Sequence, residues 1–146
     1  MLVGIHQPHY LPWLRYFEKI ARCDVFVVLD TVPFTKNGWQ NRNKVKTVGG
    51  ETLLTVPVHV ELGQPLEAVE ICGGAWRGKH WRTIAQAYGK APHFDRYAEG
   101  LAAFYERDWR LLADLNARML EWFCGELGID TRIEYASALG VDGAAT

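Results

Sequence analysis

Cysteine is scarce in this sequence and is not arranged in pairs. Its three cysteines, Cys23, Cys72 and Cys124, lie far apart among 146 residues, and none forms a C-x-x-C pair. An odd, scattered set argues against a disulfide framework and against a structural zinc site. An excess of charge of one sign is also missing, because 16 Lys and Arg oppose 17 Asp and Glu. A chain so balanced has no general attraction to nucleic acid or to anionic membranes, so anion binding would need a local cluster.

Long apolar runs are absent as well. No run approaches the ~20 residues of a membrane-spanning helix, and no basic segment precedes the first apolar stretch as it would in a signal peptide. We therefore expect a cytoplasmic protein without a membrane span. With 49% hydrophobic residues and this length, the chain is expected to form one domain, residues 1–146.

The order of apolar segments predicts an α/β fold. Residues 2–5 and 24–30 are continuous apolar runs, typical of strands buried on both faces, and residues 12–22 between them have helical spacing. Such a strand–helix–strand unit predicts two parallel strands. The remaining expected segments are hairpin turns at Asn37-Gly38 and 48–50, strands at 52–60, 67–72 and 131–136, and helices at 76–90, at 93–106 and from an Asp108 cap onward. The C-terminal helices are expected to pack on a mixed sheet.

The segment GIHQPHYLPW, residues 4–13, holds unusual polar groups at a predicted strand-to-helix junction. Ligands bind at such junctions in α/β sheets, and a helix N-terminus favours phosphate. His6 and His9 are therefore candidate catalytic residues, with Gln7 and Tyr10 as candidate binding residues. The alternative is a loop whose histidines are satisfied by backbone groups. A metal is not predicted, because Pro8 breaks the helical alignment that H-x-x-H would need.

The segment TKNGWQNRNKVK, residues 35–46, is a second candidate. No acidic residue occurs from Thr31 to Gly50. Cations could neutralise a diphosphate, while amides and a ring could contact a base. RNA binding and an exposed, solvated hairpin are the alternatives. The candidate binding residues here are Lys36, Trp39, Gln40, Asn41, Arg42, Asn43 and Lys44.

Two further polar residues stand out. Asp30 ends the second predicted strand, where its carboxylate could meet a ribose, a metal or an amine, or could act as a base. It could equally pair with Lys36 or Arg42. Asn116 lies among apolar neighbours on the last predicted helix, which indicates a buried amide with a hydrogen-bonding partner.

Several segments resemble the WbqC-like protein family of bacteria. They are IHQPHYLPWLRYFEKIARCDVFVVLD, WQNRNKVKT, LLTVPV, HWRTIAQAYGKAPHFDRY and WRLLADLN, in this order between Val3 and about Leu139. Members of that family occur with O-antigen genes, so the resemblance implies work on an activated sugar, including acylation of an amino sugar. The opening also resembles, more distantly, the nucleotidylyltransferases, in which histidines at this turn bind phosphates. The chain departs from the family pattern at His9 and Pro33 and stops before the family's usual C-terminal part.

Two hypotheses follow. The first is a transferase of surface-polysaccharide biosynthesis that acts on a nucleotide-linked sugar, with His6, His9 and Asp30 as its catalytic residues. The second is a non-catalytic nucleotide- or RNA-binding module, or a structural subunit of a biosynthetic complex. A homo-oligomer or a complex partner fits either hypothesis, and the sequence names no cofactor.

Overall fold

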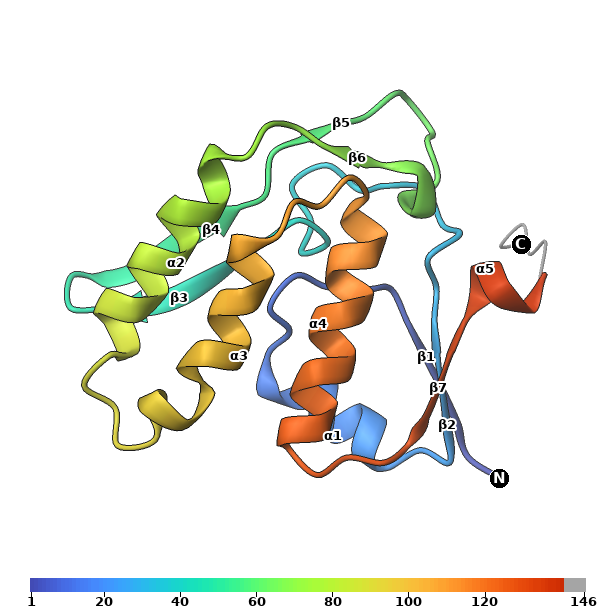
Figure 1. Ribbon diagram of the computed structural model, residues 1–146. Helices are drawn as coiled ribbons and strands as arrows, with labels where there is room; N and C mark the ends of the chain where they lie inside the picture. The colour runs from blue at the N-terminus through green and yellow to red at the C-terminus, as the bar shows by residue number, and fades with distance from the viewer. Residues whose placement is uncertain (141–146) are drawn as a thin grey trace.

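The computed structural model describes residues 1–140 of the chain; residues 141–146, the end of the predicted domain, lie outside the described part. The chain alternates strands and helices at both ends and has its antiparallel strands in the middle (Figure 1). The strands are β1 (Val3–His6), β2 (Val25–Val28), β3 (Arg42–Thr47), β4 (Gly50–Thr55), β5 (Val58–His59), β6 (Glu70–Ile71) and β7 (Arg132–Tyr135). The helices are α1 (Leu14–Ala21), η1 (Leu66–Ala68), α2 (Ala75–Tyr88), α3 (Phe94–Glu106), α4 (Leu112–Glu126) and α5 (Ala136–Leu139).

A parallel sheet joins the two ends of the described chain. Its order is β1-β2-β7, and its last register row is His6, Val28 and Tyr135. The predicted strand–helix–strand unit and the predicted last strand are confirmed. Because all strands are parallel, their carboxyl ends lie along one edge of the sheet, and the segments that follow them start there.

Only one face of this sheet is fully covered. Phe26 and Val28 of β2 are buried with residues of α1 and α4. Val3 and Ile5 of β1 are 45% and 51% exposed, so the expectation of burial on both faces is wrong for the first strand. Side chains alternate between faces along a strand, and these two point to the face that no buried cluster of the described residues includes.

The middle strands form separate antiparallel pairs. β3 pairs with β4 around the predicted turn at 48–50, and β5 pairs with β6. The strands therefore divide into three sheets, whereas a single mixed sheet was expected. Asn37-Gly38 does not join two strands. It forms a loop turn in which Asn37 has φ +63° and the Gly38 amide donates to the Thr35 carbonyl at 3.2 Å.

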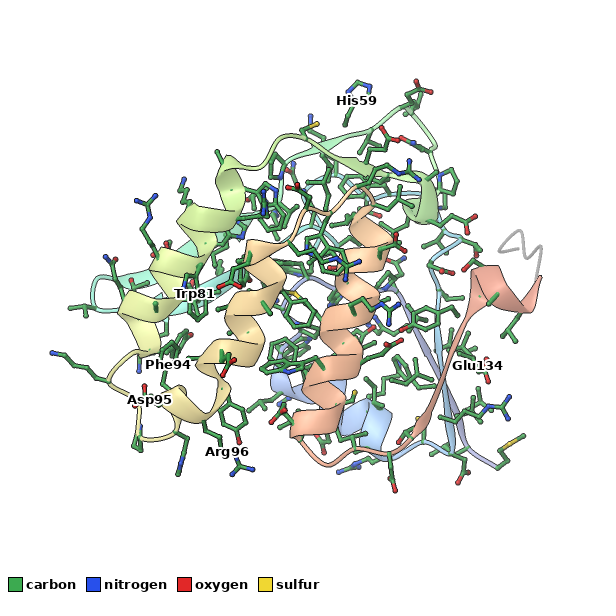
Figure 2. The ribbon with its side chains drawn as sticks, viewed as in Figure 1. His59, Trp81, Phe94, Asp95, Arg96 and Glu134 are labelled. Carbon is green, nitrogen blue, oxygen red and sulfur yellow. The ribbon has the colours of Figure 1, made fainter. Side chains whose placement is uncertain are left out.

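The helices organise two apolar clusters, and α4 contributes to both. Leu112, Leu115 and Met119 pack with the hairpin and with α2 and α3. Leu120 and Cys124 pack with α1 and the parallel sheet. Between α2 and α3, Trp81 and Phe94 stack with ring centroids 6.1 Å apart (Figure 2). These contacts make α4 the element that holds the sheet half and the hairpin half together.

The start of α4 differs from its prediction. The helix starts at Leu112 and has no side-chain cap. Asp108, the expected cap, instead forms an ion pair with Arg77 of α2 at 2.5 Å. The segment from 108 to 111 is thereby held as a connection between helices.

Candidate functional site

A cleft of about 370 Å³ opens where the three parallel strands end. We call it the strand-end cleft. Residues after β1, the end of β2 and its following turn, the end of β7 and the start of α5 form one side, and the first three turns of α4 form the other. Its lining residues are Pro8, His9, Tyr16, Val28, Asp30, Ala113, Asp114, Asn116, Ala117, Arg118, Leu120, Glu121, Tyr135, Ser137 and Ala138.

His9 lines this cleft, and His6, which is not among the lining residues, packs beside it. Their ring centroids are 4.8 Å apart, and both rings pack against Tyr16 of α1. Burial, and then the proximity of His6, lower the pKa of His9 to about 4. His9 is therefore neutral near pH 7, with one donor and one acceptor nitrogen. Its Nδ1 is buried and has no hydrogen-bonding partner among the described residues, whereas His6 Nδ1 lies 2.9 Å from the Gln7 carbonyl.

Asp30 connects β2 to the last helix. Its carboxylate accepts hydrogen bonds from the Ser137 amide at 2.8 Å and from the Ser137 hydroxyl. Its backbone carbonyl accepts from the Glu67 amide at 2.8 Å. Asp30 is thus hydrogen-bonded to α5. It makes no ion pair with Lys36 or Arg42, although such a pair was the alternative that the sequence left open. Each carboxylate oxygen can accept one further hydrogen bond, and Asp30 lines the cleft.

Asn116 lies in the opposite wall, on α4. It is 2% exposed, and its Nδ2 donates to the Gln40 carbonyl at 2.8 Å. Gln40 is held in turn, because its Oε1 accepts from the Thr35 amide and its Nε2 donates to Gln7 Oε1 at 2.9 Å. The expected partner of Asn116 is therefore found for one end of its amide only. The other end, Oδ1, is buried without a partner among the described residues.

Six side chains of the cleft with polar groups were missed by sequence reasoning: Tyr16, Asp114, Arg118, Glu121, Tyr135 and Ser137. Tyr135 donates to Glu121 Oε1 at 3.0 Å, and Arg118 lies 3.8 Å from Glu121 Oε2. Burial, and then the Glu121 carboxylate, raise the pKa of Tyr135. Tyr135 and Ser137 could have been found, because they fall at the end of a predicted parallel strand. The α4 residues lay in a periodic pattern that indicated only a packed helix.

Tyr10 does not reach this cleft. The chain after His9 turns into the larger apolar cluster, and Leu11 adopts φ +45° to allow it. Tyr10 is fully buried there, with its hydroxyl 2.8 Å from His80 Nδ1 and 2.6 Å from the Tyr105 hydroxyl. We call these three residues the buried tyrosine–histidine network. Their geometry gives Tyr10 a structural role, and the binding role remains only a prediction.

The basic segment at residues 35–46, which we call the basic loop, borders a different cavity. Lys36, Asn41 and Arg42 line a space of about 570 Å³ together with residues of β4, β5 and the turn that follows, and no residue lines both this cavity and the strand-end cleft. Arg42 donates to the Asn37 and Gly38 carbonyls and lies over the Trp39 ring. The predicted binding residues of the basic loop thus lie together, but they lie apart from His9 and Asp30.

The other loop residues mainly hold structure. Asn43 donates to the carbonyls of Tyr10 and Leu11 at 3.1 and 2.7 Å, so it fixes the turn before α1. Lys44 pairs with Glu51 across the hairpin at 2.8 Å. Their direct contact with a ligand stays a prediction.

The N-terminus of α1 does not face the strand-end cleft. The residues at its start, Pro12, Trp13 and Leu14, line an apolar space of about 480 Å³ against α3 and α4. The phosphate site expected at this helix start therefore has no counterpart in the cleft. Two other helices begin at the cleft, the four-residue α5 and the longer α4, whose first turn carries the acidic Asp114.

Two further findings concern residues 1–140. The described residues hold no group of three or more His, Cys, Asp or Glu side chains arranged to share a metal ion. Nor does any helix in this part of the chain have the length and apolar character needed to cross a membrane.

These features define an α/β protein with a polar cleft at the carboxyl edge of a parallel sheet. Its sequence matches the model of the WbqC-like protein family over residues 7–146, and the chain belongs to that family. It is 40% identical over 134 residues to a protein of Mycobacterium tuberculosis named "Uncharacterized protein Rv1507c". That match covers 90% of this chain and 58% of the relative. No solved structure matches the chain.

Proposed function

We propose that this chain is a transferase of surface-polysaccharide (O-antigen) biosynthesis that acts on a nucleotide-linked sugar, with the sugar in the strand-end cleft. The observation that carries the proposal is a pair of buried polar atoms, His9 Nδ1 and Asn116 Oδ1, on two residues that line the same cleft; neither atom has a hydrogen-bonding partner within residues 1–140. Buried polar groups are nearly always hydrogen-bonded in folded proteins. Two exceptions in one cleft support a polar ligand that completes both.

The reaction we favour is transfer of an acyl or related group to an amino sugar. An amine that arrives as an ammonium must first give up one proton. The free amine then attacks the transferred group and loses a second proton as the new bond forms, while the bond between that group and its carrier breaks and the carrier leaves. With a pKa of about 4, His9 is neutral near pH 7 but is a weak base, so its ring would accept a hydrogen bond from the amine while the protons leave to water. Asp30, held by Ser137, would orient the acceptor.

The nucleotide part of the ligand would extend beyond the cleft. A volume of about 370 Å³ suits a single sugar better than a whole nucleotide sugar. The basic loop is the candidate for the diphosphate, through Lys36 and Arg42, although it borders a different cavity. We place the reaction in the cytoplasm and allow for a second copy or a complex partner, which light scattering of the purified protein would detect.

A thermal-shift titration tests the proposal. The probes are UDP-glucose, UDP-glucosamine, UDP alone and a short RNA. A ligand at 100 times its Kd stabilises a protein by about 2.7 kcal/mol, which raises the Tm of such a domain by several degrees. We expect a shift with a UDP-sugar that exceeds the shift with UDP.

Matched variants give the titration its control. His9→Gln should remove the extra shift, whereas His59→Gln should retain it, because His59 is exposed on β5 away from the cleft (Figure 2). A shift with RNA alone, lost in Arg42→Ala, would favour the non-catalytic binding module instead. No shift with any probe in a folded sample would contradict the proposal.

A further inference from the structure

The polar groups of the strand-end cleft are unequally divided between acceptors and donors. Asp30, Asp114 and Glu121 contribute carboxylates, and Asn116 contributes its unpartnered oxygen. The cation among the lining residues is Arg118, which lies near Glu121. With His9 neutral, the cleft carries more negative than positive charge near pH 7. Such a cleft attracts hydrogen-bond donors and cations, and it repels phosphate.

The orientation of the Asn116 amide is fixed by its neighbour. Its Nδ2 donates to the Gln40 carbonyl, which can only accept, so a flipped amide would bring two oxygens together. Gln40 cannot move away easily, because its own side chain is bonded to Thr35 and to Gln7. Asn116 Oδ1 is consequently the free end of the amide, and only a donor can satisfy it.

An ammonium group fits these acceptors best. It offers three N–H donors and a positive charge, whereas a hydroxyl offers one donor and no charge. Hydrogen bonds between charged groups are about twice as strong as neutral ones. The Asp30 carboxylate, already fixed by Ser137, can accept one donor while Asn116 accepts another.

We infer that the strand-end cleft recognises a free primary amine, held between the Asp30 carboxylate and Asn116 Oδ1, and that its ligand is an unacylated amino sugar. The inference rests on the proposed function and adds which groups of the cleft hold the amine of the amino sugar. It assigns recognition to Asn116, a residue that the sequence indicated only as a buried amide.

Paired ligands that differ at one substituent test the inference. The probes are glucosamine, glucose and N-acetylglucosamine, each free and as its UDP derivative, titrated at about pH 6.5, where an amine is still largely protonated. The Kd of each is measured by NMR titration. We expect glucosamine in at least one of its two forms to bind about tenfold or more tightly than the matched glucose and N-acetyl compounds.

Variants identify the atoms responsible. Asp30→Asn and Asn116→Leu should each remove the preference for the amine while leaving the Kd of the glucose compound within about threefold. Asp95→Asn on α3 is the matched control, since that carboxylate is exposed far from the cleft (Figure 2). Thermal melts show whether each variant folds. If Asn116→Leu does not fold, Asp30→Asn alone tests the inference.

The outcomes separate the two proposals. Equal affinity for amine, hydroxyl and N-acetyl compounds, or no saturable binding of either amine form, overturns the inference. A tenfold preference for the amine without any gain from the UDP moiety supports the inference and contradicts the nucleotide-linked part of the proposed function. Tighter binding of the UDP derivatives with no preference for the amine supports the nucleotide-linked part of the proposed function and overturns the inference.

Discussion

His80 and His9 differ in the hydrogen bonding of their ring nitrogens, although burial lowers the pKa of each to about 4. His80 is buried, and His9 is half-buried with its Nδ1 enclosed. Both ring nitrogens of His80 have partners: Nε2 lies 3.0 Å from the Thr55 carbonyl, and Nδ1 lies 2.8 Å from the Tyr10 hydroxyl. His9 Nδ1 has none within residues 1–140. A closed network stabilises the fold, whereas an open one leaves capacity for a ligand.

The closed network has a definite direction. The Thr55 carbonyl can only accept, so His80 Nε2 carries the proton and Nδ1 accepts from the Tyr10 hydroxyl. The Tyr10 oxygen then accepts from the Tyr105 hydroxyl. Each member is buried, and no donor is left without an acceptor. The difference from the strand-end cleft teaches that burial alone does not mark a site. An unpartnered atom does so only where it adjoins a cavity, because Trp76 Nε1, beside His80, also lacks a partner within residues 1–140 but does not line the cleft.

The largest effect is expected from opening the closed network. Tyr10→Phe removes one hydroxyl and leaves both His80 Nδ1 and the Tyr105 hydroxyl without partners. Each unsatisfied buried group costs about 1–3 kcal/mol, so the free energy of unfolding should fall by at least about 2 kcal/mol. Urea denaturation measures it. Tyr97→Phe, at a half-buried ring on α3, is the control and should change stability by less than about 0.5 kcal/mol.

Acid is expected to lower the stability of the fold through the protonation of both His9 and His80. Their folded pKa values lie below the ordinary value of 6.5, so the unfolded chain binds more protons between about pH 6.5 and 4. Stability should therefore be full above pH 6.5 and should decrease as the pH falls toward 4. Thermal melts across this range measure the slope.

The variants distinguish the two rings in acid. His9→Gln should flatten the slope while leaving stability at neutral pH almost unchanged, because its Nδ1 has no bond to lose. His80→Gln should also flatten the slope but should lower stability at every pH. Equal losses at neutral pH would contradict the comparison.

A pair of buried asparagines gives a smaller effect with a sharper contrast. Asn116→Leu loses the bond to Gln40 but also removes an unsatisfied oxygen, so the change in unfolding free energy should be within about 1 kcal/mol. Asn41→Leu loses the bond to the Val56 carbonyl without that compensation, and should cost about 1–3 kcal/mol. A larger loss in Asn116→Leu than in Asn41→Leu, by urea denaturation, would be evidence against a binding role for the amide.

The smallest effect on stability is expected in the hairpin formed by β3 and β4. Lys44 and Glu51 form an ion pair whose side chains are about half and two-thirds exposed. Exposed pairs contribute little, so Lys44→Ala should change stability by less than about 0.5 kcal/mol. If Lys44→Ala instead weakened UDP-sugar binding without changing the Tm of the free protein, the hairpin would belong to the ligand site.

Local pattern was enough to predict the elements. Continuous apolar runs at 2–5 and 24–30 around a helical segment predicted β1, α1 and β2, since strand and helix periodicities differ and are set by neighbours in sequence. Predictions that depended on distant partners were less successful. Asp108 was expected to cap α4, but Arg77, 31 residues away, takes its carboxylate.

The candidate site divides in the same way. The junction after β1 predicted His9, and the end of the second predicted strand predicted Asp30, as residues near strand ends; both line the cleft. The electrostatic pattern of residues 35–46 suggested one joint site, yet Lys36 and Arg42 line another cavity. Charge in a sequence says which ligand a segment could attract, but not which other segment it faces.

The sequence by itself determined the α/β class, the parallel start and the family, because these follow from local periodicity and from specific motifs. Only the tertiary structure decided that Tyr10 closes a buried network while His9 stays open, one residue apart. Only the structure also brought Asn116 of α4 into the same cleft as Asp30, which follows β2. The reason is that hydrogen-bonding partners here come from residues up to 107 positions apart, as in the bond between Ser137 and Asp30. Which polar atoms remain free is fixed only when those distant segments pack together.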